Sequence, residues 1–180
     1  MDPSETDNVD PVTQRMGFFL VPHFSMMALS SVTEPLRAVN RVSGKPLYSW
    51  HLISVDGEPV SSSSGFALLP EFAITSSPEF SHLFVVASIG VSDYRNAQVF
   101  DFLRRYAATG LTLGGISLGT MILARAGLLD RRRCTIHWEA LRELAEEFPS
   151  LDVSRDIYCI DGDRMTCSGG TAAIDMMLEL

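Results

Sequence analysis

The stretch Leu113-Gly114-Gly115-Ile116-Ser117-Leu118-Gly119-Thr120 joins an apolar run to the start of a helical pattern through one serine. This pattern is typical of a buried strand that turns sharply into a helix and exposes the serine hydroxyl on the turn. Small residues on both sides of Ser117 allow strand and helix to approach closely. Two interpretations remain open here: a nucleophile elbow, or an ordinary strand–helix loop whose glycines serve packing.

The segments on either side of this stretch alternate between two patterns. Short apolar runs typical of buried parallel strands occupy residues 17–22 and 83–87. Helical spacing of apolar residues follows at 26–42, 96–108, 118–126, 139–148 and from 171 onward. A strand is also expected at 48–55, a short one at 66–69, and a hairpin around 161–163. This alternation predicts an α/β fold with a mostly parallel sheet covered on both faces.

Composition limits the organisation and the partners of the chain. A length of 180 residues favours one domain, which we place at residues 16–180 after a disordered acidic tail at 1–15. The net charge of −8 excludes a generic nucleic-acid binder, because phosphate contacts need a basic face. We expect no membrane segment and no signal peptide. Three cysteines without paired or metal-like spacing indicate free thiols and a cytoplasmic location.

Two further segments carry candidate chemistry. His137 follows the elbow helix and could act as its base, although a lone histidine more often caps or packs. Trp138 beside it is either core or a wall of a site. The run Ala87-Ser88-Ile89-Gly90 ends a strand, where ligands bind in open α/β sheets. The Leu118 amide, at a helix start, is a candidate donor to an anion.

Several runs in combination resemble the DJ-1/PfpI domain of the class I glutamine amidotransferase-like superfamily. The resemblance is closest to the version at the N-terminus of AraC-family transcriptional regulators. It rests on residues 18–22, 34–40, 114–119, 124–130, 135–138 and 169–175. Within that branch, residues 48–50 and 54–57 look most like regulators of glycine betaine, dimethylglycine and carnitine catabolism, while other relatives respond to arginine.

The resemblance implies a three-layer α/β/α sandwich with a flavodoxin-like sheet of the DJ-1/PfpI type. It also implies a C-terminal helix-turn-helix domain, absent from this chain, through which DNA would be bound. The last helical pattern has no stop signal, so we expect the front part of a longer polypeptide. Such regulators commonly act as dimers, and a homodimer is compatible with the sequence.

The residues depart from the enzyme pattern of that superfamily. Its enzymes place a cysteine where this chain has Ser117, and a serine needs a positioned base to become nucleophilic. An acidic residue on the first helix assists that cysteine, and the matching position here is Ala28, with Glu34 nearby. No obvious carboxylate orients His137, since Glu139 is close in sequence. We therefore expect a non-catalytic domain that needs no cofactor or metal.

The expected ligand site keeps the pocket without the chemistry. Gly90, Ser117 and Leu118 would hold a carboxylate, and His137 would add a donor. An apolar or aromatic wall would come from Phe24, Trp138 and the pair Met26-Met27, although core packing is the simpler role for a methionine.

Three functions compete at this point. The leading interpretation is the effector-sensing domain of an AraC-type regulator, which binds a small amino-acid-like, zwitterionic or quaternary amine metabolite. The alternatives are a hydrolase, glyoxalase or deglycase that uses Ser117 and His137, and a structural dimerisation domain with a vestigial pocket.

The charge balance predicts that this domain alone has no measurable affinity for duplex DNA at physiological salt, because it lacks a surplus of cations to displace counterions. A gel-shift titration at several salt concentrations checks this expectation. A salt-sensitive shift would contradict it.

Overall fold

The computed structural model describes residues 13–180 and has a central sheet of seven strands in the order β10-β11-β7-β6-β1-β2-β5. Neighbouring strands are parallel except β10 and β11, which form the antiparallel hairpin expected around 161–163. The strands are β1 (Gln14–Leu20), β2 (Tyr48–Ser54), β5 (Phe72–Ala73), β6 (His82–Ala87), β7 (Thr112–Ser117), β10 (Tyr158–Asp161) and β11 (Arg164–Cys167). The expected mostly parallel sheet is confirmed.

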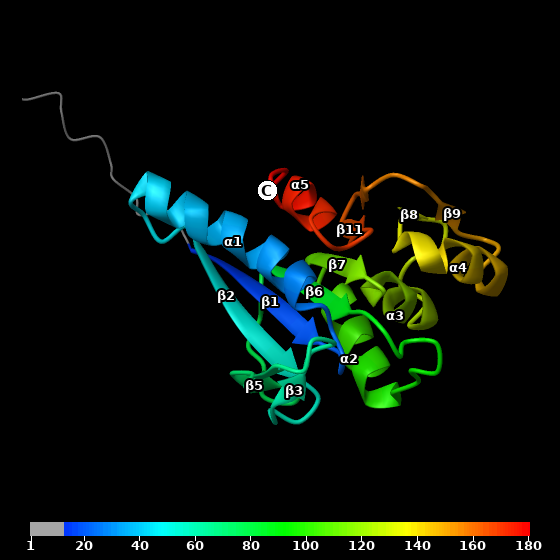
Figure 1. The fold of residues 1–180 in the computed structure, drawn as a ribbon, viewed down its shortest axis with the longest axis horizontal. Coiled ribbons are helices and arrows are strands. Elements are labelled where there is room, and N and C mark those ends of the chain that lie inside the picture. Colours follow the sequence, from blue (N-terminus) through cyan, green and yellow to red (C-terminus); the bar gives the residue numbers. More distant parts are fainter. Residues whose placement is uncertain (1–12) are drawn as a thin grey trace, which may run out of the picture.

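Helices cover both faces of this sheet, which gives the three layers visible in Figure 1. The helices are α1 (Met26–Ser43), α2 (Ala97–Ala107), α3 (Gly119–Arg125), the 3-10 turn η1 (Trp138–Ala140), α4 (Leu141–Glu147) and α5 (Ala172–Met177). Helices α1 and α5 pack together over one face, and α2 and α3 pack over the other.

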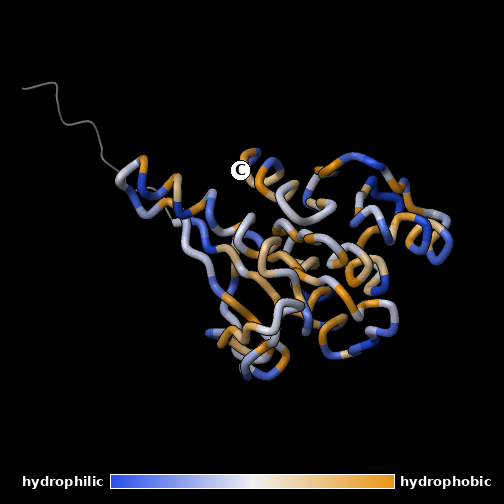
Figure 2. Tube along the Cα trace, in the orientation of Figure 1, coloured by the Kyte–Doolittle hydropathy of each residue, from blue (hydrophilic) through white to orange (hydrophobic). Residues whose placement is uncertain are grey.

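Side chains along β1 point alternately to the two faces of the sheet, so this one strand contributes to both hydrophobic cores. Met16, Phe18 and Leu20 pack with α1 and α5, while Phe19 and Val21 pack with α2 and α3. Successive strand residues point to opposite faces, so a strand buried on both sides is apolar throughout. Figure 2 shows this as a hydrophobic centre in the tube.

The order β2-β1-β6-β7-β11 is the flavodoxin-like arrangement. The chain moves from β1 outward to β2 and then returns to the other side of β1 at β6, so the direction reverses between β1 and β6. Ligands in such sheets bind beyond the carboxyl ends of the strands at this reversal. Gly90 and Ser117 lie at that edge, after β6 and at the end of β7.

Some boundaries differ from expectation. The tail was predicted to extend to residue 15, but Gln14 and Arg15 belong to β1 because their backbones pair with Tyr48 and Ser49. The rest of that tail, residues 1–12, lies outside the described part of the chain. The last helix ends at Met177, three residues before the end of the sequence.

Four strands of two residues each were not predicted from the sequence. They are β3 (Val60–Ser61), β5, β8 (Arg133–Cys134) and β9 (Asp152–Val153), whereas β4 (Ala67–Leu68) lies in the strand expected at 66–69. Strands this short carry too little alternation to be recognised in a sequence.

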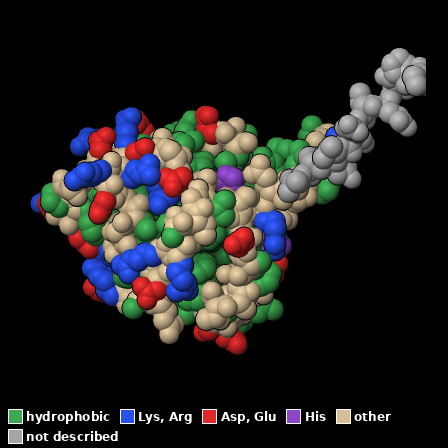
Figure 3. Space-filling view, turned by 180° about the vertical axis from the view of Figure 1, so that it is seen from behind, with side chains coloured by type: hydrophobic (Ala, Val, Ile, Leu, Met, Phe, Trp, Pro, Cys, Tyr) green, Lys and Arg blue, Asp and Glu red, His purple; other side chains and the backbone are tan. Residues whose placement is uncertain are grey.

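On the face seen in Figure 3, basic and acidic side chains are interspersed rather than segregated. Within residues 13–180, no helix is both long enough and apolar enough to cross a bilayer.

Candidate functional site

Ser117 occupies the sharp turn between β7 and α3. It is the last residue of β7, its φ is +58°, and only 4% of its surface is exposed. A non-glycine residue at positive φ costs of order 1–3 kcal/mol and persists only where the surrounding packing enforces it. The interpretation of this stretch as an elbow, rather than an ordinary loop, is therefore confirmed in the backbone.

Glycines around the turn make this conformation possible. A Cβ on Gly119 would lie 2.0 Å from the Val85 carbonyl oxygen, and one on Gly115 would lie 2.6 Å from the Thr120 amide nitrogen. A Cβ on Gly169 would lie 2.4 Å from the Ser117 Cβ. No side chain fits at such separations. The sequence analysis identified the first two glycines by their spacing, but not the contact with Gly169, which comes from the distant turn after β11.

The start of α1 lies beside the elbow region. The Met27 side chain is 58% exposed, and its terminal methyl lies 3.4 Å from the position of a Cβ on Gly170. Ala28 is completely buried in the core under α1. Glu34 forms a 2.6 Å ion pair with Arg37 on the exposed side of the same helix. The first helix thus supplies a thioether to this region and no carboxylate at the position of Ala28.

No hydrogen-bond partner of the Ser117 hydroxyl lies among residues 13–180, so its hydrogen-bonding capacity is unused, although the residue is only 4% exposed. The Leu118 amide, also expected to bind an anion, donates to the Ala87 carbonyl oxygen at 3.3 Å, near the upper limit for such a bond. Gly90 is exposed, with φ +81°. Since α3 has only seven residues, its dipole adds little, and anion binding depends mainly on the hydroxyl.

His137 lies on a segment that hydrogen bonds fasten beside the elbow helix. The Thr120 hydroxyl donates to the Thr135 carbonyl oxygen at 2.9 Å, and the Thr135 amide donates to the Thr166 hydroxyl at 2.9 Å. The His137 Nδ1 lies 3.6 Å from a Glu139 carboxylate oxygen, which is ion-pair distance but too long for a hydrogen bond. Glu139, which the sequence left uncertain, is thus a loose partner of the imidazole.

The two aromatic residues expected to form a wall differ sharply in exposure. Trp138 is 70% exposed, and its ring centroid lies 5.7 Å from that of His137. Phe24 is completely buried in the core with Val32 and Leu36 of α1. Its predicted role as a ligand wall is wrong for this structure, because its ring packs into the core that α1 covers and presents no surface to a ligand.

Cys167, one of the three cysteines expected to be free thiols, is a buried neighbour of the elbow. It pairs with Ile116 across the sheet and is completely buried. Burial raises the pKa of its thiol to about 11, while the backbone at Gly169 and Ser117 partly opposes the rise. Burial likewise raises the pKa of Cys134 to about 12. Both thiols remain protonated at neutral pH, so neither replaces the missing elbow cysteine.

Two cavities lie along the carboxyl edge of the sheet. One of about 10 Å³ touches Leu118 and has room for a single water at most. The other, of about 380 Å³, lies at the ends of β1 and β2 and was not predicted. Its lining includes Pro22, His23, Asp56 and Glu58. A small ligand at the elbow therefore has to occupy the surface beside Ser117 rather than an enclosed chamber.

Comparison with known proteins explains this combination of a retained turn and altered side chains. The model of the DJ-1/PfpI family matches residues 19–180. The chain belongs to the DJ-1/PfpI family. The resemblance inferred from the sequence, and the fold expected from it, are confirmed.

Individual relatives refine this assignment. The HTH-type transcriptional regulator CdhR of Pseudomonas aeruginosa is 43% identical over 169 residues, which cover 94% of this chain and 50% of the regulator. A crystal structure of an AraC family transcriptional regulator from Pseudomonas putida superposes with a TM-score of 0.83 at 28% identity, covering 92% of this chain and 89% of that one. An isonitrile hydratase of Pseudomonas putida is 30% identical and covers 92% of this chain and 70% of the enzyme. The chain spans about half the length of the matching regulator.

We expect Gly169→Ala to destabilise the domain more than Gly127→Ala. Both glycines have positive φ (+85° and +73°), so both variants carry the backbone penalty of roughly 1–2 kcal/mol. Only Gly169 faces a clash, with Ser117, which adds about 1–3 kcal/mol by overpacking. Urea unfolding of both variants measures the difference. Equal losses would show that Gly169 does not support the elbow.

Proposed function

We propose that this domain is the effector-sensing half of an AraC-type transcriptional regulator and binds a small metabolite beside Ser117. The single observation that carries the proposal is a preserved elbow backbone that presents a free serine hydroxyl where the superfamily's enzymes present a thiol. Similarity to the regulator CdhR over 94% of the chain supports the same function. DNA binding would belong to a further domain, as expected from the resemblance.

Sensing is favoured over catalysis by what surrounds the hydroxyl. A serine nucleophile needs a base within hydrogen-bond reach, and the Ser117 hydroxyl has no such partner among residues 13–180. The first helix places the methyl group of Ala28 in the core and no carboxylate there. Binding has lower demands, because a hydroxyl, the His137 ring and the exposed Trp138 face can hold a carboxylate and a quaternary ammonium without moving protons.

Enzymatic hydrolysis or hydration by Ser117 and His137 is the second candidate function. It is favoured by the isonitrile hydratase relative and by the 3.6 Å approach of Glu139 to His137. Such an enzyme would convert methylglyoxal, an acyl ester or an isonitrile, whereas a sensing domain would only bind. A third possibility, a structural domain with a vestigial pocket, predicts no binding of any small zwitterion.

A first test is thermal unfolding with glycine betaine, dimethylglycine, carnitine and arginine. A ligand at 100 times its Kd adds about 2.7 kcal/mol to the stability of the folded state. For a domain of this size that corresponds to a rise in Tm of roughly 5–10 °C. Ser117→Ala should weaken the binding of the active compound by about 0.5–1.5 kcal/mol, the value of one hydrogen bond, or by up to ~3 kcal/mol if the hydroxyl donates to a charged carboxylate. Folding should stay nearly unchanged.

Glu58→Gln is the matched control for that measurement. Glu58 lines the 380 Å³ cavity at the ends of β1 and β2, so its substitution alters that cavity and leaves the elbow intact. The proposal expects unchanged affinity in Glu58→Gln. Binding that depends on Glu58 and not on Ser117 would place the effector in the cavity and overturn the proposed site.

Restoring the thiol tests for hidden catalytic machinery. Ser117→Cys should not create a fast enzyme, because Ala28 still provides no acidic group to assist the cysteine. The measurement is the rate of methylglyoxal consumption by the wild type and the variant at equal concentration. A large gain in the variant would show that the elbow had kept its catalytic surroundings, and the sensing interpretation would have to be abandoned.

A further inference from the structure

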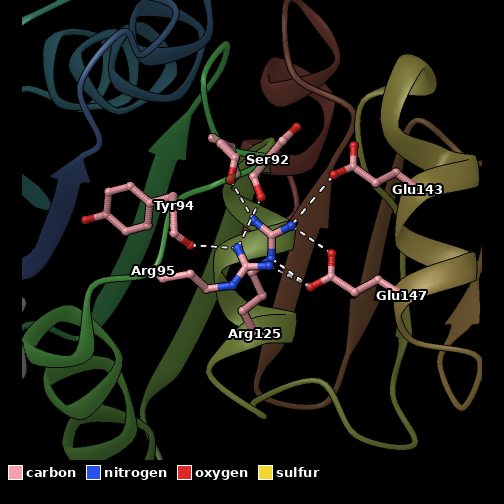
Figure 4. A network of polar contacts seen from close by, with 7 residues as sticks. Ser92, Tyr94, Arg95, Arg125, Glu143 and Glu147 are labelled. Carbon is pink, nitrogen blue, oxygen red and sulfur yellow. Dashed lines mark hydrogen bonds and ion pairs between the residues drawn. The ribbon is translucent and has the colours of Figure 1, made fainter.

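Arg125, in the last turn of α3, is a charged side chain that is only 4% exposed. Its Nη1 donates to the Val91 carbonyl oxygen at 2.6 Å. Its Nε and Nη2 donate to the two carboxylate oxygens of Glu147 at 2.9 and 2.7 Å, and Nη2 lies 3.7 Å from Glu143 (Figure 4). A buried guanidinium is tolerated only when its donors are met in this way.

Arg95 adds a second layer to the network. Its Nη1 donates to the carbonyl oxygens of Ser92 and Tyr94 at 3.1 and 3.0 Å, and its Nη2 reaches Glu147 at 3.3 Å (Figure 4). The Arg125 hydrogen bond holds the pKa of Glu147 below its usual value. Glu147 therefore stays ionised at neutral pH and is shared by two guanidinium groups, one from α3 and one from the loop after β6.

The segments joined by this network are those that carry the candidate site. Helix α3 begins directly after Ser117 and Leu118, the loop at 91–95 directly follows Gly90, and α4 follows His137 and Trp138 through the turn η1. The 10 Å³ cavity between Val91, Leu118 and Ala140 lies where the three segments meet. Arg125 lies on α3 and is hydrogen-bonded to the other two segments, through the Val91 carbonyl oxygen of the loop and the Glu147 carboxylate of α4.

We propose that Arg125 is the positioning residue of the ligand site, because it sets the Gly90 loop and the His137-Trp138 turn relative to Ser117. Its effect on ligand binding rests on the proposed function, whereas its effect on the two segments does not. The planar guanidinium is needed for this role. It directs one donor toward the loop and a parallel pair toward the carboxylate, whereas a lysine ammonium is a point charge that cannot match both directions.

Arg125→Lys tests the proposal, with Arg104→Lys as the matched control. Arg104 also touches the end of α3, since its Nε donates to the Ala126 carbonyl oxygen at 2.9 Å, and it pairs with Asp101 at 3.1 Å. Neither of these partners belongs to the Gly90 loop or to α4. Both variants therefore lose a guanidinium near the C-terminal end of α3, but only Arg125→Lys loses contacts with the Gly90 loop and α4.

The first readout needs no ligand. In Arg125→Lys, amide hydrogen exchange in residues 88–96 and 137–147 should accelerate by about tenfold or more while exchange in β1 and β6 is unchanged, as for a local rather than global opening. The chain has two tryptophans, so a Trp50→Phe background leaves Trp138 as the only source of tryptophan fluorescence. Acrylamide quenching of Trp138 should change in Arg125→Lys and stay unchanged in Arg104→Lys.

The second readout is the affinity for glycine betaine. If the wild type binds it, Arg125→Lys should lower the affinity by about tenfold and Arg104→Lys by less than about twofold, since only the first misplaces the donors. If the wild type binds none of the tested zwitterions, the proposed function fails, and the exchange and quenching data still decide the role of Arg125. Should Arg125→Lys fail to fold, Glu147→Gln replaces it, because that change removes the shared charge at constant size.

Uniform acceleration of exchange across the whole domain would reduce Arg125 to a general stabilising residue. So would equal effects of Arg125→Lys and Arg104→Lys, or unchanged exchange in both segments. Any of these results would overturn the proposal.

Discussion

The close approach of three chain segments at Ser117 is the constraint on which the rest of this structure depends. The residue ends β7 at φ +58°. Gly115, Gly119 and Gly169 permit this close packing, because a Cβ on any of them would clash with a neighbouring segment. Without those glycines, α3 could not start against Val85 and the turn after β11 could not lie against the serine. The strain at one residue is thus maintained by packing spread over β6, β7, α3 and β11.

Much of this arrangement follows from the sequence, for physical reasons. Strands buried on both faces are apolar throughout, so β1, β6 and β7 stand out as runs. Helices covering a sheet show apolar residues at helical spacing, so α1 and α2 do as well. The elbow was one of two interpretations of the sequence, because one polar residue between an apolar run and a helix, with glycines on both sides, fits either an elbow or a tightly packed loop. The short strands β8 and β9 have no such pattern, because two residues show no period.

The parts of the site that were missed or misplaced depend on contacts between distant segments. The contact between Gly169 and Ser117 arises only when the turn after β11 folds back onto the elbow. Phe24 was assigned to the ligand wall, but whether its ring turns inward depends on the helix that covers it. The bond from Arg125 to Val91 likewise links residues that no local pattern connects.

In this chain the backbone of the elbow is combined with side chains that differ from those expected of the superfamily's enzymes. Cys167 is protonated at neutral pH, Ala28 lies on the first helix and Ser117 occupies the turn. These side chains support our proposal that the domain binds a small polar ligand. The two arginine side chains that hold the loop and α4 fit the same interpretation, since a binding site needs its walls fixed even when no bond is broken.

The most direct test of this central claim is a crystal structure of the domain grown with the zwitterion that raises its Tm most. The account predicts an intact molecule whose carboxylate accepts a hydrogen bond from the Ser117 hydroxyl, with the Trp138 ring beside it. An ester on Ser117 would contradict the absence of catalysis. A ligand seated only in the cavity between the ends of β1 and β2, with nothing at Ser117, would contradict the role of the elbow in binding.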